Sequence, residues 1–198
     1  MKALIVVDVQ NDFLPGGALA VPDGELVIPV INKVADDFGL VVATQDWHPA
    51  DHLSFASQHP GRRPGETILL HGRPQVLWPD HCVQGTKGAE FSAGLDGAAT
   101  ENVFRKGTDR SIDSYSGFLD NDHRTHTGLH SFLQSREVSH VCVCGLATDY
   151  CVKFTALDAV ELGYQTSLLV DACRGVNLQP NDVVTAKRTI QAAGVMLV

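Results

Sequence analysis

The sequence lacks an apolar run long enough to cross a bilayer. A spanning helix needs about 18–20 consecutive apolar residues, and charged or polar residues interrupt every apolar run of this chain earlier. The first apolar stretch ends at Asp8, before the core of a secretory signal peptide could form. We therefore expect no membrane association and a cytoplasmic location.

An excess of basic residues is also missing. Lysine and arginine number 15 against 23 aspartate and glutamate residues, a formal net charge of −8. Phosphate binding requires a cluster of basic side chains, and none is visible, so we expect no nucleic-acid partner. Apolar residues make up 44% of the chain and charged residues 19%, which is an ordinary globular balance and argues against disorder.

A disulfide framework is not expected either. The chain has 198 residues, which corresponds to one domain over residues 1–198, and a domain of this size does not need covalent cross-links. The number of cysteines is odd, so we expect reduced thiols. The five cysteines are Cys82, Cys142, Cys144, Cys151 and Cys173.

Apolar runs alternate with helical patterns along the chain. Buried strands are predicted at residues 2–7, 40–44, 103–106, 138–145, 165–170 and 195–198. Helices are predicted at residues 25–38, 127–135, 151–162 and 181–193. Residues 47–100 are predicted to be a long excursion with at most one short strand or helix. The alternation indicates a three-layer α/β fold, with a mostly parallel, doubly wound sheet of about six strands and helices on both faces.

Three residues of complementary chemistry follow predicted strands. Asp8 follows the first strand, Lys106 closes the third, and Cys151 opens a helix after the fourth. Taken singly, they read as a turn former, a solvated charge and a packing residue. Together, at the carboxyl edge of one sheet, they suit a thiol nucleophile, a carboxylate that moves its proton and a cation that lowers its pKa.

Histidines concentrate next to the second predicted strand. Asp46 ends this strand, His48 and His52 follow it closely, and His81 lies further on. A carboxylate with two or three imidazoles and no thiolate suits a catalytic zinc, iron or manganese ion with open coordination positions. An Asp-x-His pair is a weak signal by itself, but its place at a strand end favours a metal site.

The sequence resembles the isochorismatase-like cysteine hydrolases, and within them the nicotinamidase (pyrazinamidase) branch, over nearly its whole length. The matching segments are VVDVQNDF (residues 6–13), TQDWHP (44–49), WPDHCVQGT (78–86), KG (106–107), SYS (114–116) and GLATDYCV (145–152). The resemblance implies that Asp8, Lys106 and Cys151 form a catalytic triad. It also implies that Asp46, His48 and His81 bind a metal. His52 matches a histidine that only some members have near the metal.

The resemblance also implies how the substrate would be held. It implies a cis peptide between Leu146 and Ala147, with the backbone N–H groups of Ala147 and Cys151 forming an oxyanion hole. The residues expected to flank a pyridine ring are Phe13, Trp78 and Tyr150. The chain ends at its last predicted strand, where many members of the family continue. This difference lies outside the matching motifs, so the expected fold and chemistry are unaffected. It could change the interface of a homo-oligomer.

The activity implied by the resemblance is hydrolysis of nicotinamide, and of pyrazinamide, to the acid and ammonia through a thioester, within NAD salvage. The small-molecule partner is a pyridine carboxamide, and the cofactor is one divalent transition metal, zinc first and iron or manganese otherwise. An isochorismatase or a carbamoyl-amide hydrolase is the alternative within the superfamily. A metal or redox sensor built on Cys82, Cys142, Cys144 and the histidines is the alternative outside it, but it leaves Asp8 and Lys106 unexplained.

Overall fold

The computed structural model describes residues 1–96 and 102–198, and its centre is a parallel sheet of six strands in the order β5-β2-β1-β6-β7-β8. Neighbouring strands in this sheet all run parallel. The strands are β1 (Lys2–Val7), β2 (Val41–Asp46), β5 (Val103–Lys106), β6 (His140–Leu146), β7 (Gln165–Arg174) and β8 (Met196–Leu197). The sequence-based prediction of a mostly parallel sheet of about six strands is confirmed.

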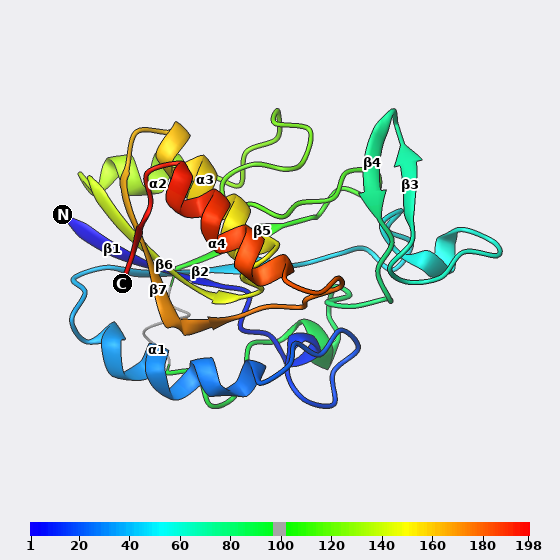
Figure 1. The fold of residues 1–198 in the computed structure, drawn as a ribbon, viewed down its shortest axis with the longest axis horizontal. Helices are drawn as coiled ribbons and strands as arrows, with labels where there is room; N and C mark the ends of the chain where they lie inside the picture. Colours follow the sequence, from blue (N-terminus) through cyan, green and yellow to red (C-terminus); the bar gives the residue numbers. More distant parts are fainter. Residues whose placement is uncertain (97–101) are drawn as a thin grey trace.

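Helices cover both faces of the sheet, as Figure 1 shows, with α1 on one side and the other three α-helices on the opposite side. The α-helices are α1 (Val27–Ala35), α2 (Leu129–Ser135), α3 (Cys151–Glu161) and α4 (Asp182–Ala192). Four short 3₁₀ helices lie in the loops: η1 (Asn11–Phe13), η2 (Gly24–Leu26), η3 (Ala56–Gln58) and η4 (Lys87–Ala89). None of the helices in the described part of the chain is long and apolar enough to cross a membrane.

The central strands β1 and β2 are buried on both faces of the sheet, and their first residues after Lys2 and Leu40 are apolar. All of β2 is buried, and β1 is buried after Lys2. A strand with helices above and below has no solvent-facing side, so its sequence is a continuous apolar run instead of an alternating one. This is why the sequence locates β1 well. Strand β5, at the edge of the sheet and only partly buried, also coincides with the predicted residues 103–106.

The prediction for residues 47–100 was wrong in part. This segment contains an antiparallel hairpin of β3 (Thr67–Leu70) and β4 (Arg73–Val76), set apart from the central sheet (Figure 1), as well as η3 and η4. His71 and Gly72 connect the strands and both have positive φ, the geometry of a tight hairpin turn. Four-residue strands are too short to give a reliable alternation of apolar and polar residues, so the sequence did not predict the hairpin.

Other boundaries differ by smaller amounts. Residues 24–26 are a 3₁₀ helix, so α1 begins only at Val27, and it ends at Ala35 instead of residue 38. Strand β7 runs past the predicted residue 170 to Arg174, because a register shift between Val143 and Gly145 lets it pair with β6 again. Strands β1 and β5 match the prediction, and the other predicted elements shift by one or two residues at an end, where helices and strands are least well defined.

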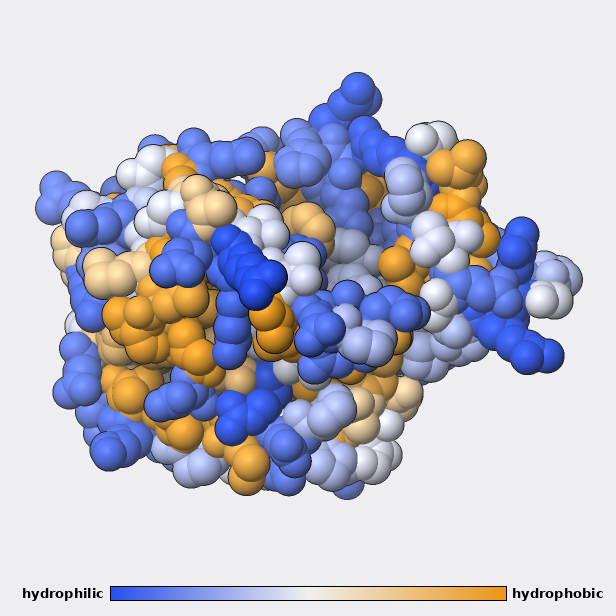
Figure 2. Space-filling model, viewed as in Figure 1, coloured by the Kyte–Doolittle hydropathy of each residue, from blue (hydrophilic) through white to orange (hydrophobic). Residues whose placement is uncertain are grey.

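One area of the surface is apolar. On the face shown in Figure 2, hydrophobic residues gather between α4 and α1, beside the edge of the sheet formed by β8. Met196 and Val198, at this edge, are each more than half exposed. Both residues belong to the last strand and to the chain end that follows it.

Candidate active site

The order of the strands brings distant residues to one point. The chain places β2 and β5 on one side of β1 and later returns to place β6 on the other side, so the carboxyl ends of β1 and β6 form the point where strand order reverses. Loops diverge there and leave a crevice in which α/β proteins hold ligands. The residues delivered to this edge are Asp8 after β1, Asp46 at the end of β2, Lys106 at the end of β5 and Cys151 at the start of α3.

The three predicted catalytic residues are in contact through Lys106. Its Nζ lies 2.9 Å from Asp8 Oδ2 and 3.3 Å from Cys151 Sγ. The same Nζ donates to Asp46 Oδ1 at 2.5 Å and to the Ser114 carbonyl at 3.0 Å. Lys106 is only 1% exposed, so its charge is compensated by these groups and not by water.

Burial shifts the pKa values of the thiol and of its neighbours. It raises the pKa of Cys151 well above the ordinary thiol value, and this effect outweighs the nearby Lys106 ammonium. The sequence predicts that the Lys106 ammonium lowers the pKa of this thiol; it does so, but by less than burial raises it. Burial also raises the pKa of Asp8, which makes this carboxylate a better acceptor for the thiol proton. Although burial opposes its charge, Lys106 has a raised pKa because Asp46 and Asp8 are close, so it stays protonated.

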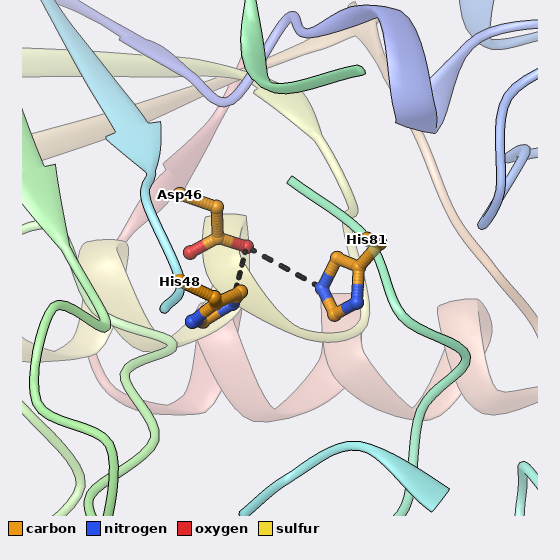
Figure 3. Close-up of side chains that lie close together, drawn as sticks. All are labelled: Asp46, His48 and His81. Atoms are coloured by element: carbon orange, nitrogen blue, oxygen red, sulfur yellow. Dashed lines mark ion pairs between the residues drawn. The ribbon is translucent and has the colours of Figure 1, made fainter. Parts of the chain in front are cut away.

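Asp46, His48 and His81 converge on one point, as Figure 3 shows. Asp46 Oδ2 lies 3.7 Å from His48 Nε2 and 3.9 Å from His81 Nε2. The three candidate ligand atoms all lie within 4.8 Å of one another, and all three residues are buried.

The hydrogen bonds of the two imidazole Nδ1 atoms show whether these residues suit a metal. His48 Nδ1 lies 2.8 Å from the carbonyl oxygen of Gly107, and His81 Nδ1 lies 2.8 Å from that of Pro79. A carbonyl accepts only, so each Nδ1 carries a proton, and the Nε2 on the side of Asp46 is the atom that could bind a metal. This is the arrangement by which proteins orient metal-binding histidines. Gly107 is required beside His48, since a Cβ there would overlap the imidazole ring. The residues fit a divalent transition metal.

His52 lies beside this group but has other partners. Its ring centroid is 4.4 Å from that of His48. Its Nδ1 lies 2.7 Å from Ser54 Oγ, and its Nε2 lies 3.3 Å from the Ile112 carbonyl. His52, His48 and Asp113 also form a group with metal-binding spacing. Its part in metal binding stays a prediction.

The thiol and the Asp46–His81 pair open into one cavity with aromatic walls. Trp78 and Tyr150 meet edge to face, with ring centroids 4.8 Å apart, and Phe13 lies against His81 at 5.5 Å. All three residues predicted to flank a substrate ring are therefore in the wall. The lining residues are Phe13, Leu19, Asp46, Trp78, His81, Asp113, Tyr115, Ala147, Tyr150, Cys151 and Val176.

The turn between β6 and α3 has the expected backbone. The peptide bond between Leu146 and Ala147 is cis, as the resemblance implied. The Ala147 carbonyl accepts hydrogen bonds from Tyr150 and Val152, which closes the turn and places Ala147 and Cys151 in the same cavity wall.

Sequence reasoning assigned no role to four residues of the cavity wall. Leu19 and Val176 come from loops without a periodic pattern. No sequence motif linked Asp113 to another candidate catalytic or metal-binding residue. Tyr115 lies in the SYS segment, so a signal for it existed. Its Oη accepts a hydrogen bond from Trp78 Nε1 at 3.2 Å, which ties the two walls of the cavity together.

Comparisons with known proteins agree with this geometry. The family model described as the isochorismatase domain matches residues 2–197. The nicotinamidase of Escherichia coli is 50% identical over 200 residues, which cover 99% of this chain and 93% of that protein.

Solved structures agree as well. A nicotinamidase and pyrazinamidase of Acinetobacter baumanii superposes with a TM-score of 0.96 at 50% identity, covering 100% of this chain and 95% of the other. The pyrazinamidase of Pyrococcus horikoshii in complex with zinc has a TM-score of 0.80 at 39% identity, covering 100% of this chain and 98% of the other. The chain belongs to the isochorismatase family.

Proposed function

We propose that this protein is an amidohydrolase that converts nicotinamide to nicotinate and ammonia, and that it accepts pyrazinamide as well. The observation that carries the proposal is the meeting of a thiol, a carboxylate and an ammonium group, with Lys106 Nζ within 3.3 Å of the other two. An Asp-His-His group lies beside them, and Cys151, Asp46 and His81 line the same cavity. The nicotinamidases among the relatives support the choice of substrate. NAD salvage is the physiological setting that we propose.

Asp46, His48 and His81 would hold the metal, for which we propose zinc because a related pyrazinamidase carries it. Iron and manganese are the alternatives that these ligands also accept. When bound, the metal supplies a Lewis acid that takes up the ring nitrogen of the substrate and so orients the carboxamide. The aromatic side chains of Phe13, Trp78 and Tyr150 would pack against the ring.

The first half of the reaction forms a thioester. Asp8 takes the proton of the Cys151 thiol, and the sulfur attacks the carbonyl carbon of the amide. The backbone N–H groups of Ala147 and Cys151 stabilise the oxyanion, and each such donor commonly contributes about 3 kcal/mol. Asp8 then gives its proton to the amide nitrogen, the C–N bond breaks, and ammonia leaves.

The second half of the reaction releases the acid. Asp8, again a carboxylate, takes a proton from a water molecule, and the hydroxide formed attacks the thioester carbon. The C–S bond breaks, the sulfur regains a proton from Asp8, and nicotinate leaves. Lys106 remains charged throughout and keeps Asp8 and the sulfur in position.

Ammonia release from nicotinamide tests the proposal. The protein is assayed as purified, after chelation of metal, and after zinc, iron or manganese is returned, with metal content measured in each state. We expect activity that is lost on chelation and restored by metal. Absence of ammonia from metal-replete protein would overturn the proposal and favour a metal-independent member of the family, for which carbamoyl amides and isochorismate are the next substrates. A thiol or metal response without amide turnover would favour a sensor.

A further inference from the structure

One buried hydroxyl next to the triad has no part in the mechanism above. Thr44 lies on β2 and is fully buried, and its Oγ1 donates a hydrogen bond of 2.6 Å to Asp8 Oδ1. The backbone joins the same two residues, since the Asp8 N–H donates to the Thr44 carbonyl at 3.3 Å. Thr44 pairs with Val7 in the sheet, so the strand register places it directly beside Asp8.

The packing around Thr44 determines where its hydroxyl points. The methyl group Cγ2 lies against the backbone of Gly117, so close that a Cβ at Gly117 would overlap it. The Gly117 N–H is in turn bound to Thr155 Oγ1 at 2.9 Å. A χ1 rotation would drive the methyl group away from this contact, and β-branched side chains are stiff at χ1. The hydroxyl is therefore held towards Asp8.

The two oxygens of Asp8 have different surroundings. Oδ1 accepts the Thr44 hydroxyl. Oδ2 faces Lys106 at 2.9 Å, yet no hydrogen bond of acceptable geometry reaches it from the residues that the structure describes. A carboxylate oxygen of Asp8 and Cys151 Sγ belong to one group of atoms that all lie within 4.8 Å of one another. Oδ1 is thus held by a hydroxyl, whereas Oδ2 lies against Lys106 without a hydrogen bond from the described residues.

We propose that Thr44 is a positioning residue for Asp8: its hydroxyl holds Oδ1 and so presents Oδ2 to Lys106 and the Cys151 thiol. This inference rests on the proposed function, because it concerns the proton transfer that Asp8 performs there. Thr44 does not line the cavity, and its hydroxyl binds Asp8 and not one of the proposed metal ligands, so we expect it to act on the rate of proton transfer more than on substrate or metal binding.

Loss of the hydroxyl leaves Asp8 Oδ1 without this hydrogen bond and Oδ2 against Lys106, so the carboxylate can rotate further about χ2, a broad and soft torsion. Misplacement of a catalytic group by about 1 Å can lower a rate by about 100-fold. We therefore expect Thr44→Val, which keeps the branched shape, to lower kcat by about 10- to 100-fold with an unchanged KM and metal content. We expect Thr44→Ser, which keeps the hydroxyl but loses the methyl group, to keep kcat within about 3-fold of the wild type.

The test measures kcat, KM, metal content and thermal stability for the wild type, Thr44→Val and Thr44→Ser. If Thr44 served only packing, Ser would be the more harmful change, because it leaves a cavity against Gly117, and Val would be nearly neutral. That order, or a Val variant with full kcat, overturns the inference. If Thr44→Val does not fold, Thr44→Ala is compared with Thr44→Ser, since both lack the methyl group and only Ser has the hydroxyl. An inactive wild type would instead refute the proposed function.

Discussion

At the scale of single residues, the site depends on groups that are ordinary by themselves. A lysine that is 1% exposed would be strongly destabilising if it were unpaired. Lys106 is tolerated because it lies against two carboxylates, the Cys151 thiol and a carbonyl group. For the Cys151 thiol the balance differs, since burial raises its pKa by more than the nearby ammonium lowers it. Reactivity therefore resides in the set of contacts and not in any one side chain.

The first prediction concerns the nucleophile. Cys151→Ala should lower turnover of nicotinamide by about 10⁴-fold or more, because no other group in the cavity can form the thioester. Metal content and nicotinamide binding should stay close to wild type, since the metal ligands and the aromatic walls are untouched. Ammonia release and calorimetric titration measure the two effects. Cys144→Ala is the control, because Cys144 is equally buried but lies within β6 outside the cavity, and it should remain active. Substantial turnover by Cys151→Ala would refute the covalent route.

The second prediction concerns a metal ligand. His48→Ala removes one of three converging ligands, so metal content should fall and KM for nicotinamide should rise by at least about 10-fold. Metal analysis and initial rates at saturating metal measure this. His59→Ala is the matched control, because His59 lies in the same excursion but binds the Leu53 carbonyl and takes no part in the cluster. A His48→Ala variant with full metal content and normal KM would remove His48 from the ligand set.

At the scale of elements, the loop after β1 is attached to the end of β2. Gln10 Oε1 accepts the Asp46 N–H at 2.8 Å, and its Nε2 donates to the Asp46 carbonyl at 2.8 Å. The same Nε2 reaches the Ala89 carbonyl of η4 at 2.9 Å. One side-chain amide thus joins three segments and holds the backbone of a candidate metal ligand. Such outer contacts determine how accurately a ligand is placed.

The third prediction follows from this contact. Gln10→Ala should weaken metal affinity by about 10- to 100-fold, because it leaves the backbone of Asp46 without two hydrogen bonds. Competition with a chromophoric chelator measures the affinity. Gln45→Ala is the control, since Gln45 also donates to the Ala89 carbonyl, at 2.9 Å, but has no hydrogen bond to Asp46. Equal metal affinities for the two variants would show that the Gln10 contact does not position the ligand.

At the scale of the whole molecule, one sheet edge collects residues from most of the chain. Asp8 follows β1, and Cys151 begins the helix that follows β6, on the other side of the reversal point. Asp46 and Lys106 end the strands β2 and β5. His81 comes from the long excursion instead, so a metal bound at this site would connect that excursion to the central sheet. Metal binding would therefore stabilise the folded protein in addition to orienting the substrate, because the ligands are assembled only in the folded state.

The fourth prediction tests this linkage. Binding at a free metal concentration of 100 times Kd adds about 2.7 kcal/mol to the free energy of unfolding. For a chain of this size the corresponding rise in Tm is about 5–10 °C. Differential scanning calorimetry with and without a chelator should show this difference for the wild type and a much smaller one for His48→Ala. An unchanged Tm, with loss of metal verified by elemental analysis, would mean that the ion does not connect these segments.

The sequence by itself determined the pattern of strands and helices, the family and the candidate residues of the triad and the metal site. These properties are local or carried by motifs: a buried parallel strand is a continuous apolar run, and Asp8, Asp46 and Lys106 stand directly at strand ends. Most strands and helices show a local pattern of apolar residues, so they could be predicted without knowledge of which distant segments pack against them.

Only the tertiary structure decided the burial of Cys151, the β3–β4 hairpin and the contacts of Gln10 and Thr44. The pKa of a thiol depends on how completely other segments exclude water from it, and periodicity carries no such information. Gln10 reaches Ala89 across 79 positions of the chain, and Thr44 reaches Asp8 across 36. Such distances along the chain are bridged by the packing of the sheet, so the placement of these groups becomes visible only when the fold is known.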